Sequence, residues 1–312
     1  ALIDKGSLTP EKQSHLAECP VCRAQSARLA GDLSGLGDMA KAMVPPMQTT
    51  IMLPEAKALK PARPWGLRLA YGSALAAALV VLVFLSFYLT RAQNNRAERE
   101  AVAAMSHALA SRVIVVDPGH GGADPGVVGK SGALEKEITL AVSRRLADNL
   151  AQAGAMVLLT RESDSDLSDP VTAGLTAKKR EDLERRVAIA NDNMADLYIS
   201  VHVNSSPAAG RSGARVYYQQ DAVQGGKAGR HIQSELSRVI KNTGHQPAAV
   251  DYYITRNTSM AAVVVEAGYI SNETEEKLLL DPAYQGKLAW AIYAGAVKYF
   301  ALEDPPARRP PE

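Results

Sequence analysis

Three side chains that could bind a metal or take part in catalysis follow short apolar runs of this sequence. His120 comes just after VIVVDPG, His202 ends LYISVH, and Glu266 ends AAVVVE. A fourth, Glu135, stands at the start of the helix expected after a glycine-rich loop. Two imidazoles and a carboxylate suit a catalytic zinc, and a further Glu suits the base that activates water. The implied chemistry is hydrolysis of an amide or an ester.

The fold must bring these four side chains together, because they lie far apart in the chain. Each apolar run that precedes a candidate residue has the length and composition of a buried strand. Parallel strands of an α/β sheet open their carboxyl ends on one edge, where ligands bind. We therefore expect His120, His202 and Glu266 at three strand ends along one edge, with Glu135 beside them.

Taken one at a time, these residues have plainer explanations. His120 can cap a turn, and acidic residues such as Glu135 and Glu137 favour a helix start because of the helix dipole. Glu266 is harder to explain in this way, since a carboxylate after three valines meets a desolvation cost unless something pairs with it or uses it. The part of the chain that contains these four residues has no cysteine, since both cysteines lie near the amino end. Any zinc bound by these residues would therefore be held by His and carboxylate, with a position left for water.

The remaining pattern alternates apolar runs with helical periodicity, which predicts an α/β domain. After the first strand we expect a helix near 136–152, a strand at 155–160, a helix near 179–193, strands at 197–202 and near 213–218, a helix near 225–242, a strand ending at Glu266, and helices near 273–280 and 283–300. The predicted fold is a mainly parallel twisted sheet with helices on both faces. A small helical zinc-finger-like segment and one transmembrane helix precede it.

Near the amino end, His15, Cys19 and Cys22 have a spacing and a chemistry that favour zinc. A redox CxxC pair and two incidental cysteines are the other interpretations. The stretch HLAECPVC resembles the zinc-binding anti-sigma fold, which takes a fourth ligand from further upstream and implies a sigma factor as partner. No Cys or His precedes His15, so we expect a partial zinc-finger segment over 1–30, followed by a proline-rich linker over 31–66.

An uncharged run over 69–90 is long enough, as a helix, to cross a bilayer core of about 30 Å. A buried globular helix or a signal peptide is the alternative. We predict a transmembrane helix over 67–90, a juxtamembrane stalk over 91–111, a catalytic domain over 112–302 and a disordered tail over 303–312.

Reduced thiols belong in the cytoplasm, so we expect the amino end inside and the catalytic domain outside. The net charge of +2 gives no strong field that would draw the chain to nucleic acid.

From 113 to 300 the chain resembles the zinc-dependent N-acetylmuramoyl-L-alanine amidases that cut bacterial peptidoglycan. The matching blocks follow the family order and are VIVVDPGHGGADPGVVG, LEKEITL, LLTRESD, RRVAIAN, LYISVHVNS and VVVEAGYISN. The resemblance implies His120, Glu135 and His202 as zinc ligands, and Glu266 as the glutamate that takes a proton from water and returns it to the L-alanine nitrogen. The stretch DLSDPVTAGLTAKKREDLERR is most similar to the amidases that modify spore cortex.

Other residues also match family positions or suit a role near such a site. Arg161, Arg186 and Asn191 are expected to brace the sheet through salt bridges and helix capping rather than to contact substrate. Arg256 is expected to meet the anionic glycan strand or stem peptide. The insertion at 163–180 has the length and the Asp, Gly and Pro content of a lid or regulatory element.

The sequence thus predicts a membrane-anchored, zinc-dependent peptidoglycan hydrolase. One alternative is a transmembrane anti-sigma-type regulator whose outer domain senses wall fragments. Another is a zinc carboxypeptidase acting on the stem peptide. The presence of all four site residues favours an enzyme, because a sensor has no need of the base.

Overall fold

The computed structural model describes residues 18–21, 24, 65–208, 210–240 and 244–303. The chain divides into two units, Ala1–Ala77 and Ala78–Glu312, and the second contains the sheet. His15, Cys22 and almost all of the predicted zinc-finger segment and linker lie outside the described residues, as does the tail from 304. Cys19 is described and is half-buried.

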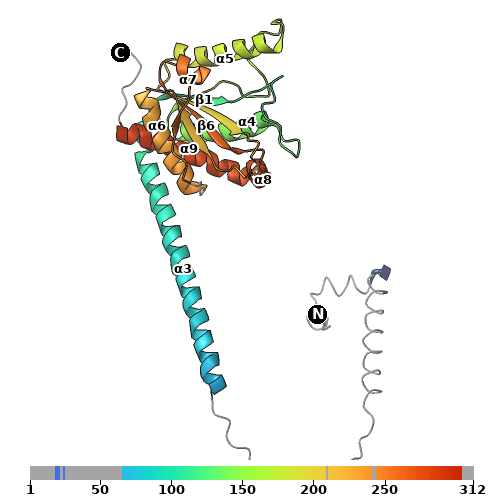
Figure 1. The fold of residues 1–312 in the computed structure, drawn as a ribbon, viewed down its shortest axis with the longest axis vertical. Coiled ribbons are helices and arrows are strands. Elements are labelled where there is room, and N and C mark those ends of the chain that lie inside the picture. The colour runs from blue at the N-terminus through green and yellow to red at the C-terminus, as the bar shows by residue number, and fades with distance from the viewer. Residues whose placement is uncertain (1–17, 22–23, 25–64, 209, 241–243, 304–312) are drawn as a thin grey trace, which may run out of the picture. The chain divides into compact units, whose positions relative to one another are not determined.

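The domain is built on one six-stranded sheet with the strand order β2-β1-β3-β6-β4-β5 (Figure 1). Its strands are β1 (Val113–Pro118), β2 (Met156–Leu159), β3 (Leu197–Asn204), β4 (Arg215–Tyr218), β5 (Ala248–Ala249) and β6 (Ala261–Tyr269). Neighbouring strands are parallel except β4 and β6, which are antiparallel. The predicted mainly parallel sheet is therefore confirmed.

Helices cover both faces of this sheet, as predicted. The larger core packs beneath α4 (Glu135–Gln152), α6 (Val223–Val239), α9 (Pro282–Glu303) and the short η2 (Ser106–Leu109), and α8 (Glu273–Leu280) adjoins α9. The smaller core lies on the face of α5 (Leu175–Asp192) and α7 (Tyr253–Asn257), which Figure 1 shows on the other side of the sheet. Strand β1 serves both, because Ile114 and Val116 belong to the larger core and Val113 and Val115 to the smaller one. Strands buried on both faces read as continuous apolar runs.

The chain enters the domain through α3 (Trp65–Met105), a single helix of 41 residues. Within the second unit its side chains from Leu79 to Leu89 are exposed. Of the described helices one is long and apolar enough to cross a membrane, over Ala76–Leu109 with a mean hydropathy of 1.7. That finding rests on length and composition alone.

Residues that precede 112, the predicted start of the catalytic domain, contribute to the larger core. Val102 near the end of α3 and Leu109 in η2 are buried members of the larger core. Lys298 of α9 forms an ion pair with Glu98 of α3. Contacts with the domain therefore reach into the predicted stalk, about four turns before residue 112.

Two predicted strand ends also differ from the structure. Glu266 lies inside β6, which continues to Tyr269, and His202 lies inside β3, which continues to Asn204. A polar side chain on a strand need not end it when that side chain points into a cavity at the sheet edge. Strand β5 and helix α7 were not predicted, because two and five residues carry no recognisable period.

Candidate active site

The loop that carries His120 is held in place by two buried arginines. His120 has a φ of 63°, a left-handed backbone conformation that costs a non-glycine residue about 1–2 kcal/mol. Arg161 donates hydrogen bonds to the carbonyl oxygens of Pro118 and Gly119, each at 3.0 Å. Arg186 donates to those of Pro118 and His120, each at 2.8 Å. The predicted bracing role of both arginines is confirmed.

Asn191 has a related bracing role. Its side chain donates to the carbonyl oxygen of Asn257 at 3.0 Å and accepts from the backbone N–H of Ser259 at 2.9 Å. It therefore ties α5 to the end of α7.

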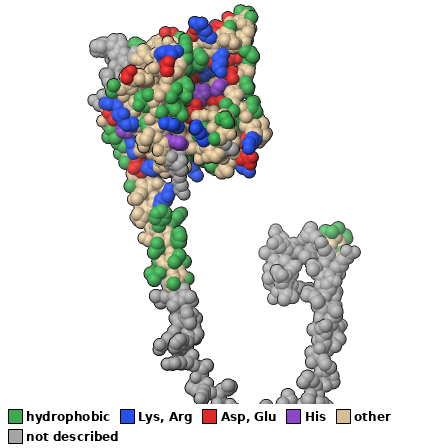
Figure 2. Space-filling model, viewed as in Figure 1, with side chains coloured by type: hydrophobic (Ala, Val, Ile, Leu, Met, Phe, Trp, Pro, Cys, Tyr) green, Lys and Arg blue, Asp and Glu red, His purple; other side chains and the backbone are tan. Residues whose placement is uncertain are grey.

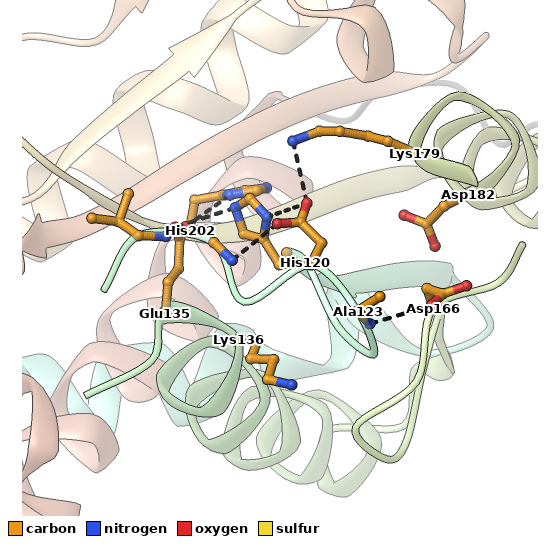
Figure 3. A network of polar contacts seen from close by, with 12 residues as sticks. His120, Ala123, Glu135, Lys136, Asp166, Lys179, Asp182 and His202 are labelled. Carbon is orange, nitrogen blue, oxygen red and sulfur yellow. Dashed lines mark hydrogen bonds and ion pairs between the residues drawn. The ribbon is translucent and has the colours of Figure 1, made fainter. Parts of the chain in front are cut away.

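His120, Glu135 and His202 converge, although they come from a loop, a helix start and a strand (Figure 3). Glu135 Oε2 lies 3.2 Å from His120 Nε2, and Glu135 Oε1 lies 3.1 Å from His202 Nδ1. The two imidazole rings are 5.0 Å apart between centroids and nearly perpendicular. One ligand atom from each residue falls within 4.8 Å of the other two.

Glu135 is held as a carboxylate although it is buried. Backbone N–H groups of Val127 and Val203 donate to its two oxygens, each at 2.9 Å. Burial alone would raise the pKa of Glu135, but hydrogen bonds and charge from His120 and His202 outweigh burial and hold that pKa well below its usual range. Its neighbour Glu137 is exposed, so the choice of Glu135 over Glu137 agrees with the geometry.

Asp124 fixes the orientation of the His120 ring. Its Oδ2 lies 2.9 Å from His120 Nδ1, which leaves Nε2 to face Glu135. Lys179 of α5 lies 3.2 Å from the same Asp124 oxygen, so α5 is linked to His120 through one carboxylate (Figure 3). Sequence reasoning missed Asp124, although its position four residues after His120 within GHGGAD was a usable signal. Nothing in the sequence marks Lys179.

Glu266 stands beside this cluster with an unsatisfied oxygen. It is the register partner of His202 on the adjacent parallel strands β3 and β6, and both side chains project on the α5 and α7 side of the sheet. Its Oε2 is buried and has no hydrogen-bond partner among the described residues. Burial raises the pKa of Glu266 to about 7, with Glu135 adding to the rise and the charges of His202 and His120 opposing it. A carboxylate with this pKa can both accept and return a proton near neutral pH.

A cavity of about 320 Å³ lies at the carboxyl ends of β1, β3 and β6, and it is lined by His120, Asp124, Lys179, His202 and Glu266. Figure 2 shows histidine side chains among acidic and basic ones on this side of the domain. Tyr252 and Tyr253 at the start of α7 form part of the wall and were not predicted. Arg256 does not line the cavity. It is exposed and pairs with Asp251 at 2.5 Å.

The donor set fits a catalytic zinc. Four ligands at 2.0–2.1 Å around a tetrahedral zinc lie about 3.3 Å from one another, close to the separations seen at Glu135. Two imidazoles and one carboxylate would leave a position for water, and Glu266, with its unpartnered oxygen, lines the same cavity as His120 and His202. His120, Glu135 and His202 would hold the ion.

Replacing Asp124 with Ala is expected to weaken the affinity for zinc by about 10- to 100-fold, because a histidine ligand loses the carboxylate that orients it. Competition with a chromophoric chelator measures this affinity. Asp124→Asn keeps an acceptor oxygen and should recover part of the loss. Asp169→Ala, which removes a half-buried carboxylate from the loop between β2 and α5, is the matched control. Equal affinities in the Asp124→Ala and Asp169→Ala variants would contradict the orienting role.

Known proteins share this sequence and this fold. The profile of Amidase_3, N-acetylmuramoyl-L-alanine amidase, matches residues 114–298. The germination-specific N-acetylmuramoyl-L-alanine amidase of Bacillus subtilis (strain 168) is 39% identical over 229 residues, which cover 73% of this chain and 94% of that protein. N-acetylmuramoyl-L-alanine amidase AmiA of Escherichia coli (strain K12) is 29% identical, covering 62% of this chain and 78% of AmiA.

A solved structure agrees with these sequence relatives. The CwlD amidase from Clostridioides difficile, in complex with the GerS lipoprotein, superposes with a TM-score of 0.59 and 36% identity, covering 61% of this chain and 98% of that one. The family match spans more than half of the chain and contains His120, Glu135, His202 and Glu266. The chain therefore belongs to the Amidase_3 family of N-acetylmuramoyl-L-alanine amidases, close to the germination-specific members.

Proposed function

We propose that this chain is a membrane-anchored, zinc-dependent hydrolase that cleaves the amide between N-acetylmuramic acid and L-alanine in peptidoglycan. The observation that carries the proposal is the convergence of His120, Glu135 and His202 beside the buried, unpartnered oxygen of Glu266. A structural site would have no use for such an oxygen, since an unsatisfied buried carboxylate destabilises the fold. Family membership supports the substrate class.

Each residue of the site has a distinct part in this reaction. His120, Glu135 and His202 hold the zinc, which supplies Lewis acidity at the scissile carbonyl when bound. Glu266 takes a proton from the attacking water and passes it to the L-alanine nitrogen as the stem peptide leaves. Asp124 and Lys179 orient His120, while Tyr252 and Tyr253 form a wall against which the substrate lies.

Spore-cortex peptidoglycan is the proposed substrate. Support comes from the 39% identity to the germination-specific amidase of Bacillus subtilis and from the likeness to the Clostridioides difficile CwlD amidase. By analogy with the complex in which CwlD was solved, a lipoprotein is the proposed partner of the catalytic domain.

Membrane anchoring through α3 is also part of the proposal. The exposed apolar side chains between Leu79 and Leu89 have no protein partner within the described residues, and a bilayer would cover them. The alignment with the Bacillus subtilis relative is longer than residues 112–312, so the similarity extends into α3. The amino end then lies in the cytoplasm and the amidase domain on the wall side.

Digestion of purified cortex peptidoglycan with product analysis tests the activity. We expect intact stem peptides with a free L-alanine amino end. Trimming of the peptide carboxyl end would instead identify a carboxypeptidase, and the absence of any product in the zinc-loaded protein would identify a sensor.

Chelation of zinc is expected to abolish this activity, and added zinc should restore it, because no side chain of the site replaces the Lewis acid. The zinc content should be one ion per chain in a Cys19→Ser/Cys22→Ser background, which removes thiolates that belong to the partial amino-terminal motif. A chelated protein that still releases stem peptides would contradict the zinc assignment.

A further inference from the structure

A second cavity lies at the opposite end of the domain from the catalytic edge. It measures about 490 Å³ and is formed where α3, α4, α6 and α9 meet. Helix α4 connects the two places, since Glu135 at its first turn belongs to the catalytic cluster and Arg145 to Gln152 in its last turns line the second cavity. The proposed reaction does not use this cavity.

Three basic side chains and one tryptophan belong to its lining. Arg99 comes from α3, Arg145 from α4, and Lys287 and Trp290 from α9. The guanidinium carbons of Arg99 and Arg238 each lie 5.4 Å from the centroid of the half-buried Trp290 ring. Tryptophan with flanking cations is typical of protein surfaces at a membrane–water interface.

The positive charge of this lining is not neutralised by the protein. Within the described part of the chain no ion pair involves Arg99, Arg145 or Lys287, and the one hydrogen bond of the Arg145 side chain goes to the carbonyl oxygen of Ala141. Asp148 is the single acidic residue in the lining. The nearby Lys298, in contrast, is paired with Glu98 and Glu235. An anion would therefore find two cations in excess, three basic residues against one acidic one.

The cavity is within reach of the bilayer surface that the proposed anchor implies. Arg99 follows Thr90, the last residue of the uncharged run, by nine residues of one helix, which corresponds to about 14 Å along its axis. The headgroup layer extends about 5–7 Å beyond the hydrocarbon core. The field of an anionic surface extends about another 8 Å into solution at physiological salt. The two distances together match the position of Arg99.

We infer that this cavity binds the headgroup phosphates of anionic phospholipids in the membrane that holds α3. The inference rests on the proposed anchor and adds a second contact between the domain and the bilayer. Two contacts at one end of the domain fix its tilt, and they direct the catalytic cavity, at the other end of α4, away from the lipid.

The two tryptophans of the chain, Trp65 and Trp290, make a direct test practical. Trp65→Phe leaves Trp290 as the single tryptophan. The full chain is placed in nanodiscs of phosphatidylcholine, with or without phosphatidylglycerol, that carry a quencher at headgroup depth. We expect stronger quenching of Trp290 in the anionic discs, and we expect Arg145→Gln/Lys287→Gln to abolish the difference. Lys178→Gln/Arg180→Gln, on α5 across the sheet, removes the same charge and should preserve it.

The outcomes separate the inference from the proposed anchor. A chain that does not co-purify with either kind of disc overturns the anchor, and the headgroup site with it. A chain that stays with the discs but is quenched equally in both overturns the headgroup site alone. An equally large change in Trp290 emission on adding inorganic phosphate to neutral discs would mean that the cavity takes free phosphate, which also overturns the lipid assignment. Circular dichroism of each variant verifies its folding.

Discussion

Glu266→Gln is expected to lower kcat for release of stem peptides by about 10²- to 10⁴-fold, the range for loss of a general base. The amide has nearly the shape of the carboxylate but cannot accept the proton of the attacking water. Zinc content should be unchanged, because the proposed ligands are His120, Glu135 and His202. Steady-state kinetics on cortex fragments, together with metal analysis of the same samples, measure both quantities.

Glu137→Gln provides the matched control for this substitution. Glu137 is an exposed carboxylate two residues after Glu135, and the same chemical change there should leave kcat and zinc content as in the parent protein. Full activity in Glu266→Gln would show that another group accepts the proton. Loss of zinc in that variant would instead make Glu266 a ligand.

Arg186→Met is expected to reduce the free energy of unfolding by about 3–5 kcal/mol, the usual cost of removing one partner of a buried ion pair. Arg186 Nη1 lies 2.6 Å from Asp117 Oδ1, and both side chains are at most 2% exposed. The methionine would fill much of the volume but leave the Asp117 carboxylate without its counter-charge. Burial alone would raise the pKa of Asp117, yet the charge of Arg186 and the hydroxyls of Ser200 and Thr160 lower it to about 2.

Urea unfolding followed by circular dichroism measures this loss. Arg185→Met is the control, since Arg185 is the preceding residue, is half exposed and pairs with Glu181 at the surface of α5. We expect a change of within about 0.5 kcal/mol there, as for most surface substitutions. A similarly small change in Arg186→Met would mean that the loop of His120 does not depend on this pair.

The central part of the fold and the catalytic cluster could be predicted, because both depend on the same local signal. Three strands are buried on both faces, so their sequences are largely apolar runs, and a His or Glu within such a run is conspicuous. The parallel order of the strands then places those residues on one edge. The bounds were less accurate, since Glu266 and His202 lie inside β6 and β3 rather than at their ends.

Features that depend on tertiary contact could not be predicted. Tyr252 reaches the cavity only because α7 folds against β6, and a helix of five residues has no period to detect. The link from Lys179 to Asp124 joins a loop to a helix more than fifty residues later. The burial of Val102 had no sequence signal either, because within an Ala-rich helix it looks like any other residue until the fold is known.

The direct continuation of α3 into the folded domain has a mechanical consequence. The turns with exposed apolar side chains and the turns that contact the domain through Val102 and Glu98 belong to one uninterrupted helix. No loop or hinge separates them. In the proposed membrane-anchored enzyme, this helix would hold the catalytic cavity at a nearly constant distance from the bilayer. Only glycan strands at that distance from the bilayer would then be substrates of the anchored enzyme.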